Sequence, residues 1–282
     1  MEENQSVYER ICRTRRNGRA TSMDYITSPS LFTDFCELHG DRAFADDHAI
    51  VGGIAKLRGM PVTVIGIEKG RDLHERMYRN FGCVLPEGYR KALRLIREAE
   101  KFHRPVICFV DTQGANCGKG AEERGAGEAI AQNLYELSTV KTPVISLMIG
   151  EGGSGGALAL AVADRVWMLE NAYYSVISPI LFKDPARAPE AAEHLRLTAD
   201  DLLSMGIIER KVAEPADFTD EAEREAFMSA LGDSLAEEFR ALSRLSDEKL
   251  VAERIEKYRK IGRYDAYSTR NSFLRKWHFF SL

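Results

Sequence analysis

The hydrophobic positions in the middle of the chain repeat one unit, in which a helical pattern is followed by a continuous apolar run. Residues 88–102 carry apolar side chains three or four positions apart, which predicts an amphipathic helix. Residues 106–110 and 144–149 are apolar runs without alternation, typical of strands that are covered on both faces of a parallel sheet. Residues 165–169 predict a third such strand. The pattern therefore predicts an α/β fold.

Other patterns flank this repeat. Residues 50–56 and 61–68 are β-rich runs separated by Arg58-Gly59, which predicts a hairpin. Beyond Glu214, apolar residues again recur three or four apart and predict one or two long helices.

The N-terminal region is polar and broken by glycine and proline. Within it, Leu31, Phe35 and Leu38 recur at helical spacing and predict a short helix over residues 30–38. We therefore expect an N-terminal arm with a short helix (1–45), a core (46–215), C-terminal helices (216–262) and a basic and aromatic tail (263–282).

Composition narrows the class of protein. Hydrophobic residues make up 44% of the 282 positions and charged residues 29%, which is typical of a globular chain. A net charge of −4 gives no general basis for binding nucleic acid or an anionic membrane. The five cysteines lack CxxC spacing, which argues against zinc and disulfides and favours a reducing compartment. With no signal-peptide pattern and no apolar run of membrane length, we expect a cytoplasmic protein.

The segment Gly150-Glu-Gly-Gly-Ser-Gly-Gly156 follows a predicted strand and matches more than one motif. It fits the dinucleotide motif GxGxxG, with Glu170 as the ribose-binding acid, but the following helix is short for such a unit. It also fits the hydrolase motif GxSxG, with Ser154 as nucleophile and His194 or His278 as base. The plainer interpretation of Ser154 is a small residue in a tight turn.

A third interpretation uses the backbone and is the one that we favour. Glycines at a strand-to-helix turn let a ligand approach closely, and the N–H groups of Gly155 and Gly156 are free at a helix N-terminus. The loop from Thr112 to Ala115 follows the neighbouring predicted strand and offers a second donor. Two such N–H groups that converge on one oxygen form an oxyanion hole.

Several motifs resemble the α subunit of bacterial acetyl-CoA carboxylase carboxyltransferase. The similarity is collinear and extends from about Tyr8 to about Gly262. The segments that carry it are Leu38-His-Gly-Asp-Arg42, Ile50-Val-Gly-Gly-Ile54, Val64-Ile-Gly66, Asn80-Phe-Gly82, Pro86-Glu-Gly-Tyr-Arg-Lys-Ala-Leu-Arg94, Gly120-Ala-Glu-Glu-Arg-Gly125, Gly150-Glu-Gly-Gly-Ser-Gly-Gly-Ala157 and Tyr174-Ser-Val-Ile-Ser-Pro179.

The resemblance implies a crotonase-like (ClpP/crotonase) fold of stacked ββα units with a helical C-terminal region. It implies transfer of a carboxyl group from carboxybiotin to acetyl-CoA, giving malonyl-CoA, the first committed step of fatty acid biosynthesis. Biotin is then carried covalently on the biotin carboxyl carrier protein, and no metal is expected in this chain. The implied partners are a carboxyltransferase β subunit, as two α with two β, and biotin carboxylase in the wider complex.

The resemblance also assigns site residues. Gly155 and Gly156 match the glycine pair whose N–H groups hold the biotin ureido oxygen, and Gly114 with Ala115 matches the other loop of that oxyanion hole. These are the expected catalytic residues.

Further residues are expected to bind the cofactor or substrate. Gly152, Gly153 and Ser154 precede the glycine pair in the same motif. Lys69 and Arg71 lie in a basic loop that matches a motif for contacts with CoA phosphates. A solvated charged turn is an equally good interpretation of that loop.

The sequence departs from the family at three places, the first of which is a curtailed N-terminal helical extension. Residues 111–118 read Asp-Thr-Gln-Gly-Ala-Asn-Cys-Gly, where the family usually has Asp-Thr-Pro-Gly-Ala-Tyr-Pro-Gly. After Pro179 about five residues of the family pattern are missing, more than one helical turn. Two alternatives therefore stay open: a divergent, non-catalytic or regulatory assembly subunit, and a stand-alone crotonase-type acyl-CoA enzyme.

Overall fold

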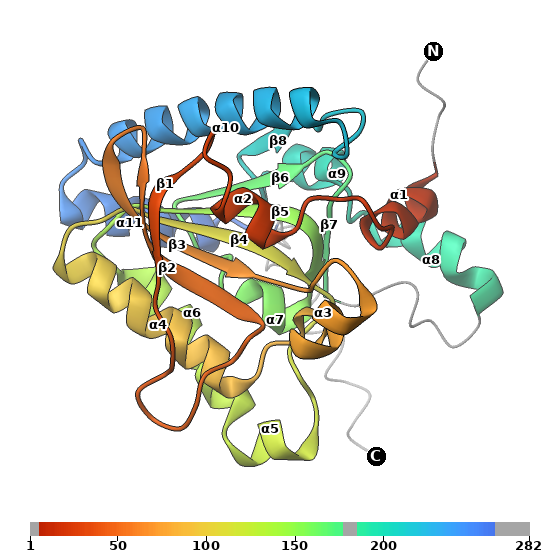
Figure 1. Cartoon of the computed structure of the whole chain (residues 1–282), viewed down its shortest axis with the longest axis horizontal. Helices are drawn as coiled ribbons and strands as arrows, with labels where there is room; N and C mark the ends of the chain where they lie inside the picture. The colour runs from red at the N-terminus through yellow and green to blue at the C-terminus, as the bar shows by residue number, and fades with distance from the viewer. Residues whose placement is uncertain (1–5, 177–184, 263–282) are drawn as a thin grey trace, which may run out of the picture.

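A computed structural model describes residues 6–176 and 185–262. An eight-stranded sheet forms its centre, with strand order β1-β2-β3-β4-β5-β6-β8 and with β7 paired to β5 (Figure 1). β1, β2 and β3 pair antiparallel, and every pairing from β3 onward is parallel. The strands are β1 (Thr33–Glu37), β2 (Ile50–Leu57), β3 (Met60–Ile67), β4 (Val106–Thr112), β5 (Val144–Gly153), β6 (Arg165–Leu169), β7 (Tyr173–Ser175) and β8 (Arg210–Val212).

Helices cover the sheet on opposite faces. A methyl group on Gly52 would meet Leu95 of α4, whereas one on Gly66 would meet Ser22 of α2 on the other face. The helices are α1 (Val7–Thr14), α2 (Ser22–Ile26), α3 (Leu73–Tyr78), α4 (Pro86–Lys101), α5 (Lys119–Glu123), α6 (Ala126–Thr139), α7 (Ser154–Leu158), α8 (Ala188–Leu195), α9 (Ala199–Ser204), α10 (Glu221–Leu242) and α11 (Asp247–Arg259), with short 3-10 turns η1 (Asn80–Gly82) and η3 (Pro185–Arg187).

The hairpin and the parallel strands that the sequence predicts are confirmed. β2 and β3 pair from Ile50 with Ile67 to Leu57 with Met60. The turn residues Arg58 and Gly59 both have positive φ (49° and 80°), which matches the twist of a two-residue hairpin. β4 and β5 are buried along their whole length, as their continuous apolar runs predict.

The predicted helix over residues 30–38 is wrong, because this segment forms β1 at the edge of the sheet. Leu38 N donates to Gly52 O at 2.8 Å, and a Cβ on Gly53 would lie 2.0 Å from Cys36 O. The absence of a side chain on Gly53 lets β1 approach β2 closely, so the pairing overrides the helical spacing. The sheet therefore begins within the segment that the sequence assigns to the arm.

The predicted turn over residues 150–156 is also corrected. β5 continues past the predicted strand over residues 144–149 to Gly153, and α7 (Ser154–Leu158) follows it directly. Glycine lowers strand propensity, but here it allows three strands to meet, because Gly152 pairs with both Thr112 and Tyr174.

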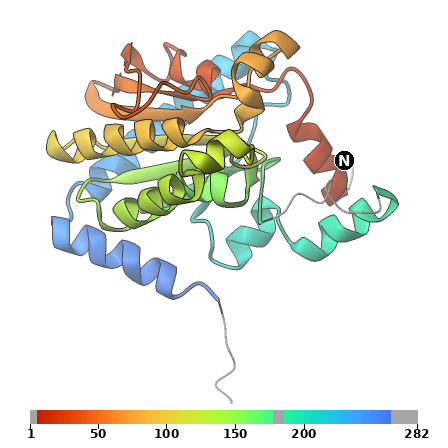
Figure 2. The same ribbon diagram turned by 90° about the horizontal axis from the view of Figure 1, so that it is seen from below.

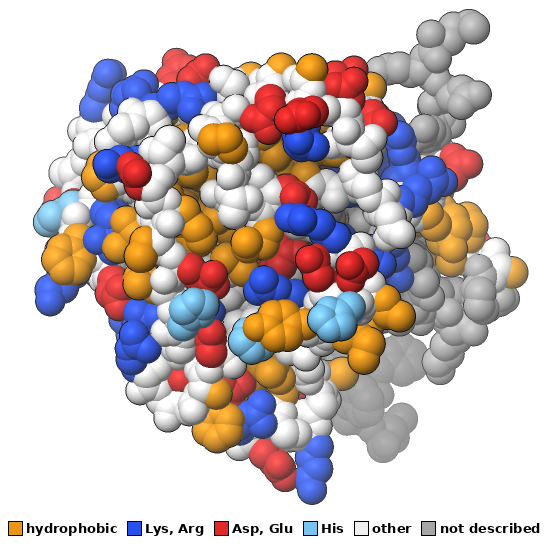
Figure 3. Space-filling model, viewed as in Figure 1, with side chains coloured by type: hydrophobic (Ala, Val, Ile, Leu, Met, Phe, Trp, Pro, Cys, Tyr) orange, Lys and Arg blue, Asp and Glu red, His pale blue; other side chains and the backbone are white. Residues whose placement is uncertain are grey.

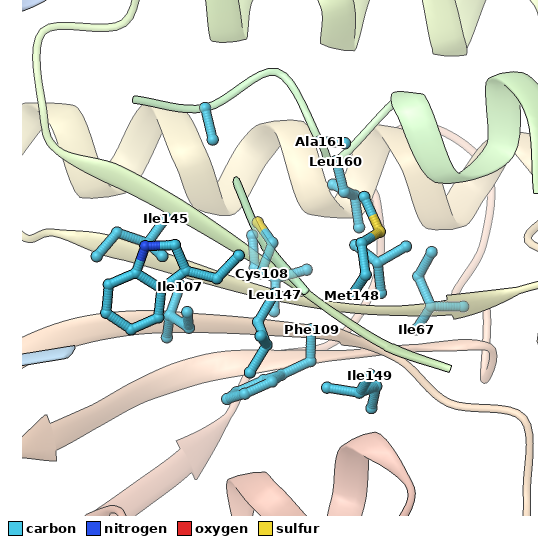
Figure 4. Packing of buried hydrophobic residues seen from close by; sticks show 14 of the residues in the cluster. Ile67, Ile107, Cys108, Phe109, Ile145, Leu147, Met148, Ile149, Leu160 and Ala161 are labelled. Carbon is cyan, nitrogen blue, oxygen red and sulfur yellow. The ribbon is translucent and has the colours of Figure 1, made fainter. Parts of the chain in front are cut away.

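The core is continuous across the sheet. Figure 4 shows Phe109 and Ile149 on one side of the strands and Met148 and Leu160 on the other. Phe109 stacks on Tyr25 of α2 with ring centroids 5.1 Å apart. The rigid sheet fixes where the ends of its strands lie.

The C-terminal region forms two helices, α10 and α11, which confirms the helical pattern past Glu214. α1 and α8 lie side by side at one end of the molecule (Figures 1 and 2). The predicted tail, residues 263–282, lies outside the described residues, and so does the site of the missing segment after Pro179.

Candidate active site

The glycine pair lies where β5 passes into α7. Ser154 has a left-handed φ of 51°, which turns the chain sharply from strand to helix. No side chain caps α7. Gly155 and Gly156 lie in its first turn, where backbone N–H groups have no partner within the helix. No hydrogen bond from these two N–H groups is formed within the described part of the chain.

A second loop lies directly against this turn. A Cβ on Gly156 would be 2.4 Å from Ala115 N and 2.7 Å from Gly114 C. Ala115 N has no acceptor among the described residues. Gly114 N, in contrast, donates to Thr112 Oγ1 at 3.0 Å. The structure thus brings the two predicted loops together and leaves Ala115, not Gly114, with the available N–H group.

Gly152 and Gly153 are buried in the sheet. A Cβ on Gly152 would lie 2.9 Å from Tyr173 O, and one on Gly153 would lie 2.2 Å from Gln113 O. Both glycines therefore allow close approach of neighbouring backbones, and their predicted cofactor contact stays a prediction.

Charged side chains form ion pairs and hydrogen bonds at the carboxyl ends of β4 and β5, next to the two loops. Asp111, at the end of β4, accepts a hydrogen bond from Glu151 N at 2.8 Å and pairs with Lys69 Nζ at 2.7 Å. Glu151 pairs with Arg15 Nε at 2.5 Å. Burial lowers the pKa of Arg15, but the Glu151 carboxylate outweighs this effect and raises it. These partners come from distant parts of the chain, so no local sequence signal marks them as a group.

The two predicted CoA-phosphate ligands differ in environment. Lys69 is largely buried and also donates to Thr14 O at 2.9 Å, so it is not part of a solvated turn. The side chain of Arg71 is 56% exposed and pairs with Asp24 Oδ1 at 3.0 Å. Both cations already have a carboxylate partner.

Tyr89 of α4 lies behind the loops. It is fully buried, and its hydroxyl has no hydrogen-bond partner among the described residues. A Cβ on Gly156 would be 3.0 Å from this hydroxyl. Burial raises the pKa of Tyr89 well above its usual value, so the group stays neutral. The apolar face of the predicted helix indicates that Tyr89 is buried, but gives no indication that its hydroxyl lies at the loops.

A cavity of about 480 Å³ opens beside Ser154 and Gly155. Most of its wall is apolar, which suits a ring system or an alkyl chain. Its lining includes Leu158, Tyr174, Leu202, Met205 and Ile207.

The geometry also decides between the motifs. Ser154 has the strained backbone of a nucleophile elbow, but no described side chain hydrogen-bonds to its hydroxyl, so it lacks a general base. His194 lies in α8, while His278 is outside the described ranges. Glu170, the acid required by the dinucleotide motif, accepts a hydrogen bond from Glu214 N at 2.9 Å. Backbone donors are the chemistry that this site offers.

A family model described as acetyl co-enzyme A carboxylase carboxyltransferase-like matches residues 2–262. The chain belongs to this family. It is 52% identical over 271 residues to the acetyl-coenzyme A carboxylase carboxyl transferase subunit alpha of Clostridium acetobutylicum, covering 94% of this chain and 98% of the relative. A protein of Natranaerobius thermophilus named as subunits beta/alpha is 53% identical over 274 residues, covering 95% of this chain and 45% of that protein. The chain is accordingly a carboxyltransferase subunit.

Solved structures agree on the fold. The malonate decarboxylase MdcD-MdcE hetero-dimer from Pseudomonas has a chain with a TM-score of 0.55 at 20% identity, covering 68% of this chain and 79% of that chain. The β subunit of geranyl-CoA carboxylase from P. aeruginosa has a TM-score of 0.56 at 16% identity. The match covers 90% of this chain and 46% of that chain. The family and these neighbours establish a crotonase-like fold.

Within residues 6–176 and 185–262, no group of three or more His, Cys, Asp or Glu side chains is arranged to hold a metal ion. No described helix is long and apolar enough to cross a membrane.

Proposed function

We propose that this chain is the α subunit of an acetyl-CoA carboxylase carboxyltransferase that transfers a carboxyl group from carboxybiotin to acetyl-CoA, giving malonyl-CoA. It acts with a β subunit, as two α with two β. The biotin carboxyl carrier protein presents biotin to it, and biotin carboxylase belongs to the wider complex.

One observation carries the assignment of the site: Gly156 lies against Ala115, and both have backbone N–H groups without acceptors. Donors fixed in a rigid backbone need no reorganisation when negative charge develops on a nearby oxygen. The sheet and its strand-end ion pairs hold these loops in place. A reaction that passes through an oxyanion therefore fits this site, whereas one that needs a side-chain nucleophile does not.

The residues present also fit biotin. The apolar cavity beside Gly155 suits its ring system and alkyl chain, and the N–H groups of Gly155 and Gly156 suit its ureido oxygen. When bound in its carboxylated form, biotin supplies the carboxyl group that is transferred. Gly155, Gly156 and Ala115 then donate to the ureido oxygen and stabilise negative charge there.

The role of Gly114 follows from its own hydrogen bond. Because its N–H group is engaged by Thr112, it shapes the loop instead of donating to a ligand. Thr112 Oγ1 in turn donates to Gly82 O at 2.7 Å, which ties the loop to η1. In this way the loop keeps a defined position without the two prolines that are usual in the family.

The decisive experiment is biotin-dependent decarboxylation of malonyl-CoA, measured on the full chain with and without its β subunit. Activity in the mixture alone is the expected result. Complex formation without activity would contradict the proposal and identify a non-catalytic assembly subunit. Turnover by the chain alone would contradict the two-subunit site and identify a stand-alone acyl-CoA enzyme.

A further inference from the structure

The loop that carries the Ala115 N–H group runs from the end of β4 to the start of α6 and includes α5. Near its beginning, Asn116 N donates to Val84 O at 3.0 Å. Most of the remainder faces solvent, because Ala121 is the one buried residue of α5. Figure 3 shows side chains of opposite charge together over α5, at the lower edge of the molecule. Burial of apolar side chains therefore does little to hold the far end of this loop.

The far end is held instead by an ion pair of Arg124, the residue at the end of α5. Its Nε donates to Glu87 Oε1 at 2.6 Å and its Nη2 donates to Glu87 Oε2 at 3.3 Å. A guanidinium group that binds both oxygens of a carboxylate fixes direction as well as distance. Glu87 lies in the first turn of α4, and its side chain is only 1% exposed. The pair thus joins the far end of the loop to the start of α4.

Arg90 of α4 extends this connection. Its Nη1 donates to Arg124 O at 3.1 Å, its Nη2 to Glu87 Oε1 at 3.2 Å and its Nε to Asp41 Oδ2 at 2.8 Å. Burial raises the pKa of Glu87, but the hydrogen bond from Arg124 outweighs this effect and lowers it. Glu87 is therefore ionised at neutral pH and has Arg90 as a second partner. Loss of the Arg124 side chain alone would not leave this buried carboxylate unpaired.

Both attachments of the loop are made at the same end of α4. Val84, which accepts the bond from Asn116, and Glu87, which binds Arg124, are neighbours in the sequence around the start of that helix. Ala115 directly precedes Asn116. A shift of the loop relative to α4 would therefore move the Ala115 N–H group away from its position beside the glycine turn of α7.

A purely local role of Arg124 in α5 does not account for these contacts. Its backbone N–H group bonds to Ala121 O at 3.2 Å, as expected at the end of a helix. Its side chain binds Glu87 of α4 instead of another residue of α5. Lys119 and Glu123, in contrast, form an exposed pair within α5 at 3.5 Å.

We propose that Arg124, acting through Glu87, is a positioning residue that holds the Ala115 N–H group in place as a donor. This inference rests on the proposed function, because it takes Ala115 as one of the donors to a developing oxyanion. A donor that is displaced by a fraction of an ångström stabilises that charge less. The effect of Arg124 therefore appears in the rate of the chemical step.

The test compares Arg124→Gln with Arg97→Gln, a control of equal charge change. Arg97 of α4 pairs with Glu136 of α6 at 2.6 Å, so it also joins two helices, but it is not attached to the loop. Steady-state kinetics of biotin-dependent malonyl-CoA decarboxylation, with the β subunit present, give kcat and KM. Hydrogen exchange of the full-length chain alone measures the protection of the Asn116 amide, and urea denaturation measures the stability of the whole fold.

We expect Arg124→Gln to lower kcat about 10-fold with little change in the KM for malonyl-CoA, because the donor acts on charge that develops during the reaction. The Asn116 amide should exchange faster, and the midpoint of urea denaturation should stay close to that of the wild type. Arg97→Gln should match the wild type in all three measurements. A wild-type kcat in Arg124→Gln, an equal loss in Arg97→Gln, or a lower kcat with unchanged exchange of Asn116 would overturn the inference.

A second comparison separates positioning from a general loss of folded protein. Gly156→Ala displaces the same donors, so Arg124→Gln should have little further effect on kcat in that background. A loss of folded protein would instead lower the rate by the same factor in both backgrounds. Equal factors would therefore contradict a positioning role.

The outcomes also distinguish this inference from the proposed function. If the wild-type chain shows no biotin-dependent turnover with its partner, while Arg124→Gln still speeds exchange of the Asn116 amide, the anchoring of the loop stands and the proposed function fails. If turnover occurs and Arg124→Gln keeps the wild-type kcat and exchange rate, the proposed function stands and the role of Arg124 fails.

Discussion

The two ends of the parallel strands use their hydrogen-bonding groups in opposite ways. At the start of β6, Asp164 binds the fully buried Arg254 of α11 through both carboxylate oxygens, at 2.9 and 2.7 Å. The other N–H groups of Arg254 donate to the carbonyl oxygens of Leu137, Val140 and Thr142. At the opposite end, Gly155, Gly156 and Ala115 keep N–H groups without acceptors.

Within one sheet, the end that holds Arg254 stabilises the fold, whereas the opposite end leaves groups available for function. A buried guanidinium whose donors are all used joins α11 to the strands and has no capacity for a ligand. The backbone donors at the carboxyl ends form no hydrogen bond within the described residues and remain available for a ligand. Carboxyl ends of parallel strands are the usual ligand edge of α/β proteins, and the N–H groups without acceptors lie at that edge.

Breaking the Arg254 site should have the largest effect. Arg254→Met leaves the buried Asp164 without its partner, which should lower the free energy of unfolding by about 3–5 kcal/mol. Urea denaturation measures this. The control is Lys249→Met, which breaks an exposed pair with Glu253 and should cost less than about 0.5 kcal/mol. Equal losses in the two variants would contradict the comparison.

Changing the glycine pair should instead reduce activity. Gly156→Ala places a Cβ against the backbone of Ala115 and displaces the donors, so kcat should fall about 10²–10³-fold in the assembled enzyme. Circular dichroism should still show a folded chain. Gly127→Ala is the matched control, because a Cβ there meets no atom within 4 Å. A wild-type rate in Gly156→Ala would refute the oxyanion assignment.

Acid should weaken one contact on the functional side. Burial raises the pKa of Asp46, but hydrogen bonds from Lys91 and Gly40 outweigh it and lower the pKa to about 2. This contact therefore stabilises the fold above about pH 4, and its contribution is lost as the pH falls toward 2. The difference in unfolding free energy between wild type and Asp46→Asn should shrink over that range. A difference that stays constant with pH would contradict the lowered pKa.

Removing the Tyr89 hydroxyl should have the smallest effect on stability. A buried hydroxyl without a partner is unfavourable, so Tyr89→Phe should leave the free energy of unfolding unchanged or raise it by at most about 1 kcal/mol. The Tm should accordingly stay the same or rise slightly. Tyr135→Phe, at a side chain that is 71% exposed, is the control and should change nothing. A clear drop in Tm for Tyr89→Phe alone would show that the hydroxyl has a partner.

Much of the fold was predictable because its signals are local. The hairpin at Arg58-Gly59, the buried strands and α4 each follow from patterns of neighbouring residues. The strand within residues 30–38 was not predictable, because its pairing depends on Gly53 in another element. Local periodicity carries no information about such a contact.

The candidate site was likewise predictable only where its signals are local in the sequence. Gly155 and Gly156 were identified from their place after a buried strand, and the structure puts their N–H groups free at the start of α7. Gly114 was grouped with Ala115, yet its N–H group is taken by Thr112. The conformation of the loop decides whether Gly114 or Ala115 has the free N–H group. The sequence alone, in which the two residues are adjacent, does not decide it.

By itself, the sequence determined the α/β class, the family and the glycine pair, since each depends on short motifs and on spacing along the chain. Only the tertiary structure decided which N–H groups are free, which carboxylate binds Arg124 and where the buried ion pair lies. These properties arise between segments far apart in the chain, such as Glu87 with Arg124 and Asp164 with Arg254. They are fixed by how elements pack, because charge compensation and hydrogen bonding act over a few ångströms in space and not along the sequence.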